Sequence, residues 1–360
     1  MSARASVLGL FVAGVIAIAG VSAAPAEAIE PPASVYPQAS RVVVMSNLVG
    51  ELGLFARMLR TAGLIDEEDH WSGGDAHLVI LGNVTGWGQG VMPTLRMIRR
   101  LGIEAADAGG MTHMLLGPLE IQLLNDDLGI IPPENYADLV TDKSEQRLKE
   151  FIDALAEKMV VRFPTARDPE ALRASFKHRF EGDALVGGPE FLDLIAPGTE
   201  MGDWLRSRNV VIRIGDDVYS HGGLSPDYPG VSLKEINDSF REELKHPKLI
   251  VGSKDINTTS PPWWNMLVTQ PAFKTQRMVD TVLRRRGARA LIVGINNGIE
   301  KPTRYSHSAR VFFVESGMRA YQEQFPDRKL SYLDITGDTF SLVWDGEEVD
   351  TVTPQPLPPE

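Results

Sequence analysis

The sequence predicts a mixed α/β fold with parallel strands at its centre and a helical insertion. Between residues 41 and 125, short apolar runs alternate with segments of helical apolar spacing, which is typical of β-α-β crossovers. Residues 131–205 interrupt this alternation, because they are rich in charge and show few strand signals. The chain has 360 residues, 43% of them apolar, which is enough for a large core.

The elements follow one another in a regular order. In the first part, the expected strands are 41–46, 77–81 and 111–116, and the expected helices are 50–63, 92–101 and 119–125. The insertion contains a helical run at 144–158. In the last part, we expect strands at 209–214, 217–220, 289–293, 310–314, 330–335 and 339–344, and helices near 232–243 and 275–286.

The two ends of the chain differ from the domain between them. In residues 1–28, Arg4 precedes an uncharged apolar run, and an Ala-x-Ala sequence follows at Ala26-Glu27-Ala28. This layout predicts a Sec-type signal peptide and an exported protein, periplasmic or extracellular, with an uncleaved membrane anchor as the alternative. The Pro-rich segments 29–40 and 347–360 are interpreted as a linker and a disordered tail, which leaves a domain at 41–346.

Composition excludes several kinds of chemistry. The chain has no Cys, which excludes disulfides, thiolate metal sites, iron–sulfur clusters and a thiol nucleophile. It has only seven His, and its net charge is −12. Nucleic-acid binding proteins usually show a basic face, so we expect no nucleic-acid partner.

Each predicted strand of the domain runs into a glycine-containing loop. These loops are 46–50 (SNLVG), 82–88 (GNVTGWG), 117–120 (GPLE), 220–223 (SHGG) and 294–296 (GIN). In order and spacing they resemble the calcineurin-like metallophosphoesterase family, and most closely its bacterial serine/threonine-phosphatase-like branch. The family's loops read G-D-x-H-G, G-D-x-x-D-R-G, G-N-H-E, H-G-G and G-H-T. The resemblance covers about residues 40–345 and implies a sandwich of two mixed sheets flanked by helices, with a helical insertion.

The resemblance also implies where metal ligands and catalytic residues would lie. In the family, two divalent metals clamp a phosphate and activate a water molecule. His221 is the one metal-ligand position that keeps its residue type, and Glu120 persists at a position that is structural in the family. The other metal positions hold Asn47, Val49, Asn83, Pro118 and Ile295, while the acid and phosphate-clamp positions hold Leu119, Gly86 and Trp87.

These substitutions predict that the metal site is degenerate. Two divalent ions need anionic oxygens, and the amides of Asn47 and Asn83 are neutral. A single His does not hold a divalent metal tightly. We therefore expect no metal cofactor and a non-catalytic pseudophosphatase that acts in binding. Its former active-site cleft would take an unidentified protein or small molecule, with Glu120, Trp263 and Trp264 among its lining residues.

The sequence leaves two other functions open. One is an active phosphoesterase that hydrolyses phosphomonoesters or phosphoproteins through an unusual pair of Mn, Fe or Zn ions. Such a site would use His221, Glu120 and nearby carboxylates, with Glu51, Asp216 and Asp217 as candidates. The other is a structural envelope protein.

Individual side chains also have alternative interpretations. Asn47 and Asn83 either bind each other or a polar ligand, or they replace Asp only to avoid burying unpaired charge. His221 is either a remaining metal ligand or a packed, hydrogen-bonded residue in a tight loop. Trp87, Trp263 and Trp264 either line a groove or pack in the core.

Overall fold

The computed structural model describes residues 29–162, 165, 167–178, 185–228, 230–245, 261–294, 303–318 and 329–359. The signal peptide predicted for residues 1–28 and the family position at Ile295 lie outside these residues. Within the described ranges, no helix has the length and apolar character needed to cross a membrane.

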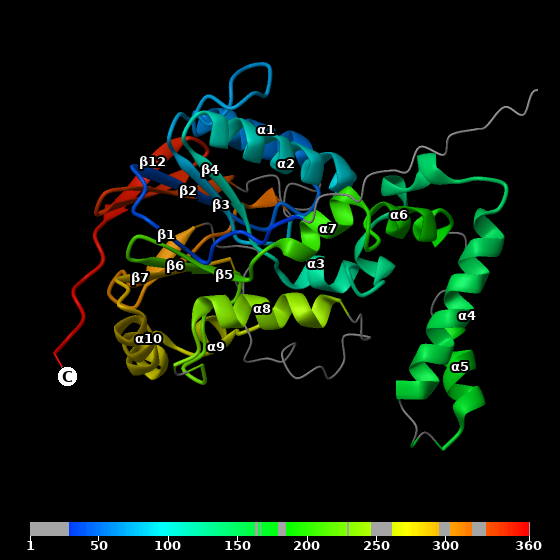
Figure 1. The fold of residues 1–360 in the computed structure, drawn as a ribbon. Coiled ribbons are helices and arrows are strands. Elements are labelled where there is room, and N and C mark those ends of the chain that lie inside the picture. The colour runs from blue at the N-terminus through cyan, green and yellow to red at the C-terminus, as the bar shows by residue number, and fades with distance from the viewer. Residues whose placement is uncertain are drawn as a thin grey trace, which may run out of the picture.

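Two six-stranded mixed sheets form the body of the molecule (Figure 1). The first sheet has the order β12-β11-β10-β2-β3-β4, in which β2, β3 and β4 are parallel and β10, β11 and β12 are antiparallel to their neighbours. Its strands are β2 (Arg41–Met45), β3 (His77–Ile80), β4 (Met111–Met114), β10 (Ser331–Thr336), β11 (Thr339–Trp344) and β12 (Glu347–Val352).

The second sheet has the order β1-β5-β6-β7-β9-β8. The pairs β1–β5, β6–β7 and β7–β9 are parallel, whereas β5–β6 and β8–β9 are antiparallel. Its strands are β1 (Val35–Tyr36), β5 (Val211–Ile214), β6 (Asp217–Ser220), β7 (Ala290–Val293), β8 (Arg304–Ser306) and β9 (Val311–Phe313). The predicted sandwich of two mixed sheets is therefore confirmed.

Side chains from both sheets fill the space between them. In β2, Val42 and Val44 belong to a buried cluster with Ile212 of β5 and Ile292 of β7. Alternate residues of the same strands belong to a second cluster, together with helix residues. Both faces of the central strands are thus buried, which explains why they read as continuous apolar runs.

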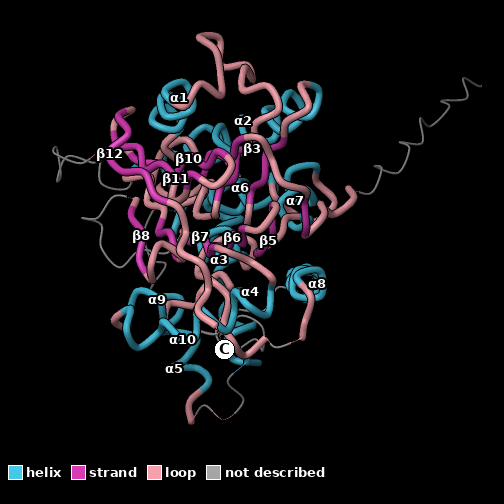
Figure 2. Tube along the Cα trace, turned by 90° about the vertical axis from the view of Figure 1, so that its left-hand side faces the viewer, coloured by secondary structure: helices cyan, strands magenta, loops and turns pink. Residues whose placement is uncertain are grey.

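Helices cover the two outer faces of the sandwich (Figure 2). Helices α1 (Leu52–Thr61) and α2 (Val91–Asp107) lie over the first sheet, and α8 (Leu233–Leu244) and α10 (Ala272–Arg286) lie over the second (Figure 1). The short helix α9 (Met266–Thr269) precedes α10.

The predicted insertion is helical. Helices α4 (Ser144–Arg162) and α5 (Pro169–His178) lie against each other and extend away from the sandwich (Figure 1). The smaller helices that precede and follow this pair in the sequence are α3 (Pro118–Leu123), η1 (Leu128–Ile130), η2 (Pro133–Asn135), η3 (Ala137–Leu139), α6 (Gly188–Leu194) and α7 (Glu200–Ser207). Trp204 and Leu205 of α7 are buried in the main core, so the end of the insertion belongs to the body of the domain.

Both terminal segments are more ordered than the sequence indicates. The segment predicted as a linker contains β1, which pairs with β5, and the segment predicted as a tail contains β12, which pairs with β11. Beyond β12, the backbone N–H of Gln355 donates to the Ser308 carbonyl oxygen at 3.2 Å, and Arg284 Nη2 donates to the Pro358 carbonyl oxygen at 2.8 Å. The prediction of a disordered tail is therefore wrong for the strand Glu347–Val352, and for the rest of the tail it stays a prediction.

Candidate functional site

The loops that follow β2 and β3 are joined through their backbones. The N–H of Asn47 donates to the Gly82 carbonyl oxygen at 3.1 Å, and the N–H of Val49 donates to the Asn83 carbonyl oxygen at 2.9 Å. Because β2 and β3 are parallel, both loops lie at the same edge of the sheet. The loops after β6 and β7 are joined in the same way, by a 2.8 Å bond from the Gly294 N–H to the His221 carbonyl oxygen.

These loops have unusual backbone geometry. Asn47, Val49 and Asn83 have φ values of 54°, 46° and 55°. Asn tolerates this left-handed region, but a β-branched Val rarely adopts it. Strain of this kind persists only where the surrounding structure enforces it. The loop shapes are therefore imposed by the fold around them.

The side chains of Asn47, Asn83 and His221 meet at this edge. Asn83 Nδ2 donates to Asn47 Oδ1 at 2.9 Å and lies 3.3 Å from His221 Nε2. His221 Nδ1 lies 2.9 Å from the Leu81 carbonyl oxygen. A carbonyl oxygen only accepts, so Nδ1 carries the ring proton and Nε2 accepts from Asn83. Asn83 thus uses both of its amide hydrogens inside the site.

The remaining polar atoms of this network also have protein partners. Asn47 Nδ2 donates to the Gly294 carbonyl oxygen at 2.9 Å and to Glu315 Oε2 at 3.0 Å. Asn83 Oδ1 accepts the N–H of Leu119 at 3.1 Å. We call the linked side chains of Asn47, Asn83 and His221 the amide–imidazole network. Its hydrogen bonds are made within the protein.

The histidine of the amide–imidazole network is held neutral. His221 is 3% exposed, and burial lowers its pKa to about 4, although the hydrogen bond to Leu81 opposes this shift. A neutral imidazole is what the geometry requires, because Nε2 must offer a lone pair to Asn83. His221 is therefore a packed, hydrogen-bonded residue of the loop.

Glu120 connects the second and third loops. One of its carboxylate oxygens accepts the N–H groups of Asn83 and Gly117, each at 2.8 Å. The other accepts the N–H of Thr85 at 2.8 Å and its hydroxyl at 3.1 Å. Burial raises the pKa of Glu120, and these hydrogen bonds oppose the shift. The carboxylate is fully used in fixing backbone, so it does not line an open cleft.

Apolar contacts occupy the other family positions that the structure describes. Val49 and Leu119 are buried in the main core. A Cβ added to Gly86 would lie 3.0 Å from the Val49 Cβ and 3.2 Å from the Leu119 Cδ1, so the three residues are in contact. Pro118 begins α3, where its missing N–H is not needed. Trp87, at 37% exposure, is the exposed aromatic residue of this group.

The two neighbouring tryptophans pack against the fold. Trp264 is 2% exposed, and a Cβ on Gly223 would lie 2.6 Å from its ring. Trp263 is partly buried and packs against the same core. The expectation that Trp264 lines a cleft is therefore wrong, since its ring fills the space beside the glycine loop.

Two of the carboxylates proposed for an unusual metal site, Asp216 and Asp217, do not lie beside His221. Asp217 begins β6 and His221 follows its end, which separates them by about 13 Å along the strand. Asp217 is bound by Arg289 at 2.9 and 3.0 Å, and Asp216 is bound by Arg213 at 2.8 Å. Glu51 precedes α1 and is half-buried, which raises its pKa.

The donor set does not fit the metal pair that the family would place here. In the described part of the chain, no group of three or more His, Asp or Glu side chains is arranged to hold a metal ion. The two atoms that could coordinate, Asn47 Oδ1 and His221 Nε2, both face the amide hydrogens of Asn83. A metal between them would have to break both bonds, and the adjoining carboxylates of Glu315 and Glu120 already accept hydrogen bonds from Asn47 and Asn83.

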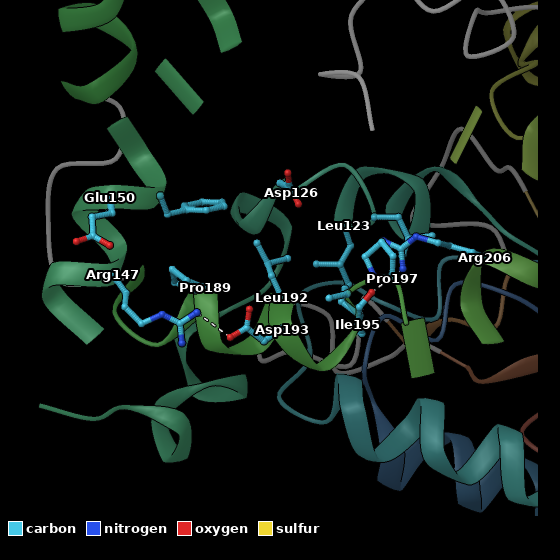
Figure 3. A pocket seen from close by; sticks show the side chains of 13 residues that line it. Leu123, Asp126, Arg147, Glu150, Pro189, Leu192, Asp193, Ile195, Pro197 and Arg206 are labelled. Carbon is cyan, nitrogen blue, oxygen red and sulfur yellow. Dashed lines mark hydrogen bonds and ion pairs between the residues drawn. The ribbon is translucent and has the colours of Figure 1, made fainter. Parts of the chain in front are cut away.

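A cavity of about 370 Å³ lies elsewhere, between the insertion and the body (Figure 3). Arg147 and Glu150 reach it from α4, and Arg206 reaches it from α7. Arg147 is bound to Asp193 at 2.7 Å. No residue of the amide–imidazole network lines this cavity.

Comparisons with known proteins agree on the fold. No family model matches the chain. A relative from Arabidopsis thaliana, Shewanella-like protein phosphatase 2, is 28% identical over 213 residues, which are 57% of this chain and 52% of the relative. The match thus spans about half the length of that relative.

Solved structures match more of the chain. A cold-active protein tyrosine phosphatase superposes with a TM-score of 0.66 at 21% identity, covering 90% of this chain and 81% of the other. This chain has the fold of the calcineurin-like metallophosphoesterases. A structure of the cold-active protein tyrosine phosphatase of a psychrophilic Shewanella gives a TM-score of 0.65, also at 21% identity, covering 91% of this chain and 83% of the other. The resemblance to this phosphatase-like family is confirmed.

Proposed function

We propose that this protein is a pseudophosphatase, an exported phosphatase-like protein without catalytic activity that acts in binding. The observation that supports this most is the pair of hydrogen bonds from Asn83 Nδ2 to Asn47 Oδ1 and His221 Nε2. By the resemblance, these three residues stand at positions that hold metal ligands in the family. A side chain that donates twice within the network cannot act there as a bridging anionic ligand.

The chemistry of phosphoester hydrolysis has no replacement in the described residues of this site. Without a metal, no bound water has a lowered pKa. Leu119 stands at the position of the family's acid, and Trp87 stands at the position of its phosphate-clamping Arg. Neither side chain donates a proton to a leaving group or neutralises a phosphate.

We infer that the surface formed by the loops around the amide–imidazole network acts in binding. The loops keep left-handed backbone geometry at Asn47, Val49 and Asn83, and a closed hydrogen-bond network supports them. Such loops are a preformed surface with little conformational entropy to lose on binding. The exposed ring of Trp87 lies on this surface, and the partner would be a protein or a small molecule.

Hydrolysis of p-nitrophenyl phosphate tests the proposal. The protein would be assayed with Mn²⁺, Fe²⁺ or Zn²⁺ beside His221→Ala, with His113→Ala as a control outside the network. We expect the same background rate in all three proteins. Metal-dependent turnover that His221→Ala abolishes and His113→Ala retains would contradict the proposal and support the active phosphoesterase.

A further inference from the structure

A second, smaller cavity lies where the two sheets meet at one side of the sandwich. Its volume is about 110 Å³. An isolated parallel bridge between Leu115 and Asn209 joins the sheets here, and both residues line the cavity. Tyr36 of β1 and Gly102 of α2 also contribute to the lining. The cavity shares no residue with the amide–imidazole network.

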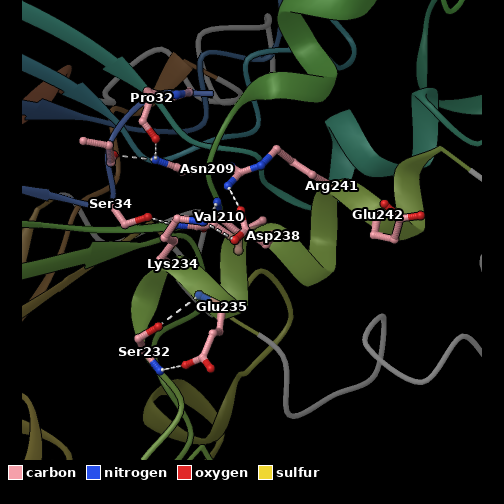
Figure 4. Close-up of polar contacts among 12 residues, drawn as sticks. Pro32, Ser34, Asn209, Val210, Ser232, Lys234, Glu235, Asp238, Arg241 and Glu242 are labelled. Atoms are coloured by element: carbon pink, nitrogen blue, oxygen red, sulfur yellow. Dashed lines mark hydrogen bonds and ion pairs between the residues drawn. The ribbon is translucent and has the colours of Figure 1, made fainter. Parts of the chain in front are cut away.

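The wall formed by the N-terminal segment is firmly held. Asn209 Nδ2 donates to the Ala33 carbonyl oxygen at 2.8 Å and to the Pro32 carbonyl oxygen at 3.3 Å (Figure 4). Asn209 Oδ1 accepts from Arg241 Nη1 at 2.7 Å. Ser34 is bound by Asn237 Nδ2 at 2.9 Å. The cavity is therefore built by fixed polar contacts.

Arg208 lines this cavity without a carboxylate partner among the described residues. Its Nε donates to the Trp204 carbonyl oxygen at 3.1 Å, and its Nη2 donates to Ser207 Oγ at 2.7 Å. Both acceptors are neutral. Burial lowers the pKa of Arg208 to about 10, and the positive charges of Arg99 and Arg241 add to this shift. Arg208 is half-buried, and its guanidinium carbon lies 5.1 Å from the centroid of the Trp204 ring, so the ring and not an anion stabilises its charge.

Two residues with hydroxyl groups, Tyr36 and Thr112, also contribute to the lining. In the part of the chain that the structure describes, the Thr112 oxygen is fully buried and makes no hydrogen bond, so it does not face the cavity. His113 Nε2 lies 3.1 Å from His77 Nδ1. Burial, His77 and Arg208 together lower the pKa of His113 to about 3. No Asp or Glu is among the lining residues, so the side chains of the lining bring no negative charge to the cavity.

We propose that this cavity binds a small tetrahedral oxyanion, either inorganic phosphate or the terminal phosphate of a larger molecule. The guanidinium of Arg208 supplies the charge, and the hydroxyl of Tyr36 supplies a further donor. A tetrahedral anion presents oxygens in several directions, so Arg208 and Tyr36 can each donate to a different oxygen. The site is independent of the proposed loss of catalysis.

Thermal unfolding of the full chain tests this site. Melting temperatures would be measured with increasing phosphate at constant ionic strength for the wild type, Arg208→Met and Arg206→Met. Arg206 is a matched control, because it lies in the same region of chain, donates to the carbonyl oxygens of Ile195 and Gly202, and lines the other cavity. We expect phosphate to raise the melting temperature of the wild type and Arg206→Met saturably, by about 2 °C more than that of Arg208→Met.

Other anions distinguish the possible sources of the bound phosphate, and equilibrium dialysis measures binding directly. O-phosphoserine raises the melting temperature as phosphate does if the bound group belongs to a larger molecule. It does not raise the melting temperature if the site binds the free ion. An equal phosphate effect in all three proteins is a general salt effect and overturns the proposal. An Arg208-dependent gain with acetate but not phosphate also overturns it. If Arg208→Met does not fold, phosphate binding to the wild type is measured by equilibrium dialysis instead. We expect about one phosphate ion per chain. A chain that binds no phosphate would contradict the site.

Discussion

Asn83 is the side chain on which the amide–imidazole network depends. Its amide nitrogen donates in two directions, toward Asn47 and His221, while its amide oxygen accepts from the Leu119 backbone. An aspartate has no hydrogen to donate, so it would place a carboxylate against two acceptors. The difference between Asn and Asp at this one position therefore separates a closed protein network from a potential metal ligand.

The substitution Asn83→Asp is expected to destabilise the protein at neutral pH by about 2–3 kcal/mol, because it places a charge at a half-buried position and breaks the donation to Asn47. It also changes the pH dependence. In the wild type, the pKa of His221 is lowered to about 4, so the stability that its neutral form contributes is lost as pH falls from 6.5 toward 4. A carboxylate beside Nε2 raises that pKa and removes this loss. Urea unfolding between pH 4.5 and 8 measures both effects.

Asn83→Ala is the matched control for this experiment. It removes the same hydrogen bonds but adds no charge, so the pH dependence between 4.5 and 6.5 should stay close to that of the wild type. If Asn83→Asp and Asn83→Ala show the same pH dependence, His221 does not interact with residue 83 as the structure indicates.

Glu120 allows a second prediction for a single residue. In Glu120→Gln, an amide group faces backbone N–H groups and at least one of the four hydrogen bonds to the carboxylate is lost. We expect a loss of about 2–4 kcal/mol in the free energy of unfolding. Chemical denaturation measures it, with Glu145→Gln in the exposed first turn of α4 as the control. Equal stabilities would show that Glu120 does not hold the loops together.

At the scale of elements, close backbone approach holds the loops after β3 and β4 together. A Cβ on Gly82 would lie 2.4 Å from the backbone nitrogen of Gly117. Gly82 also has a φ of 94°. The two loops can touch only because position 82 has no side chain.

Gly82→Ala is therefore expected to be far more harmful than a glycine substitution with backbone strain alone. Gly109 has a similar φ of 86° but no atom within 4 Å of an added Cβ. We expect Gly109→Ala to cost about 1 kcal/mol and Gly82→Ala at least about 3 kcal/mol. Thermal and urea unfolding of the two variants give the difference. Similar losses would mean that the contact with Gly117 relaxes freely.

The sequence predicted the elements whose residues have a recognisable pattern of their own. It did not predict strands that form because a neighbouring strand pairs with them. Buried strands such as β2 and β7 read as apolar runs, and α8 has a capping box at Ser232 and Glu235. In contrast, β1 has only two residues and exists because β5 pairs with it. The exposed edge strand β12 is acidic, which hides the strand pattern.

The same distinction applies to the candidate site. The loop order predicted which residues would stand at the sheet edge, because each follows a strand. It did not predict Glu315, which binds Asn47 across 268 positions of sequence. The only signal was an acidic residue just after a predicted strand. Residue type alone also did not show that the Trp264 side chain would be buried by the residues around it.

At the scale of the whole molecule, export remains a prediction from residues 1–28. We expect the mature protein to begin at Ile29, after the Ala-x-Ala sequence. N-terminal sequencing of the protein from a fractionated cell checks this. Recovery in the membrane fraction with Met1 or Ser2 at its start would indicate an uncleaved anchor.

The closed amide–imidazole network predicts that the molecule as a whole binds no catalytic metal. The most direct test is elemental analysis of the purified chain after incubation with Mn²⁺, Fe²⁺ and Zn²⁺ and removal of free ions, with His221→Ala measured in parallel. We predict a metal content far below one ion per chain, and the same value for the variant. About two ions per chain, lost in His221→Ala, would match a dinuclear phosphoesterase site and contradict the pseudophosphatase proposal.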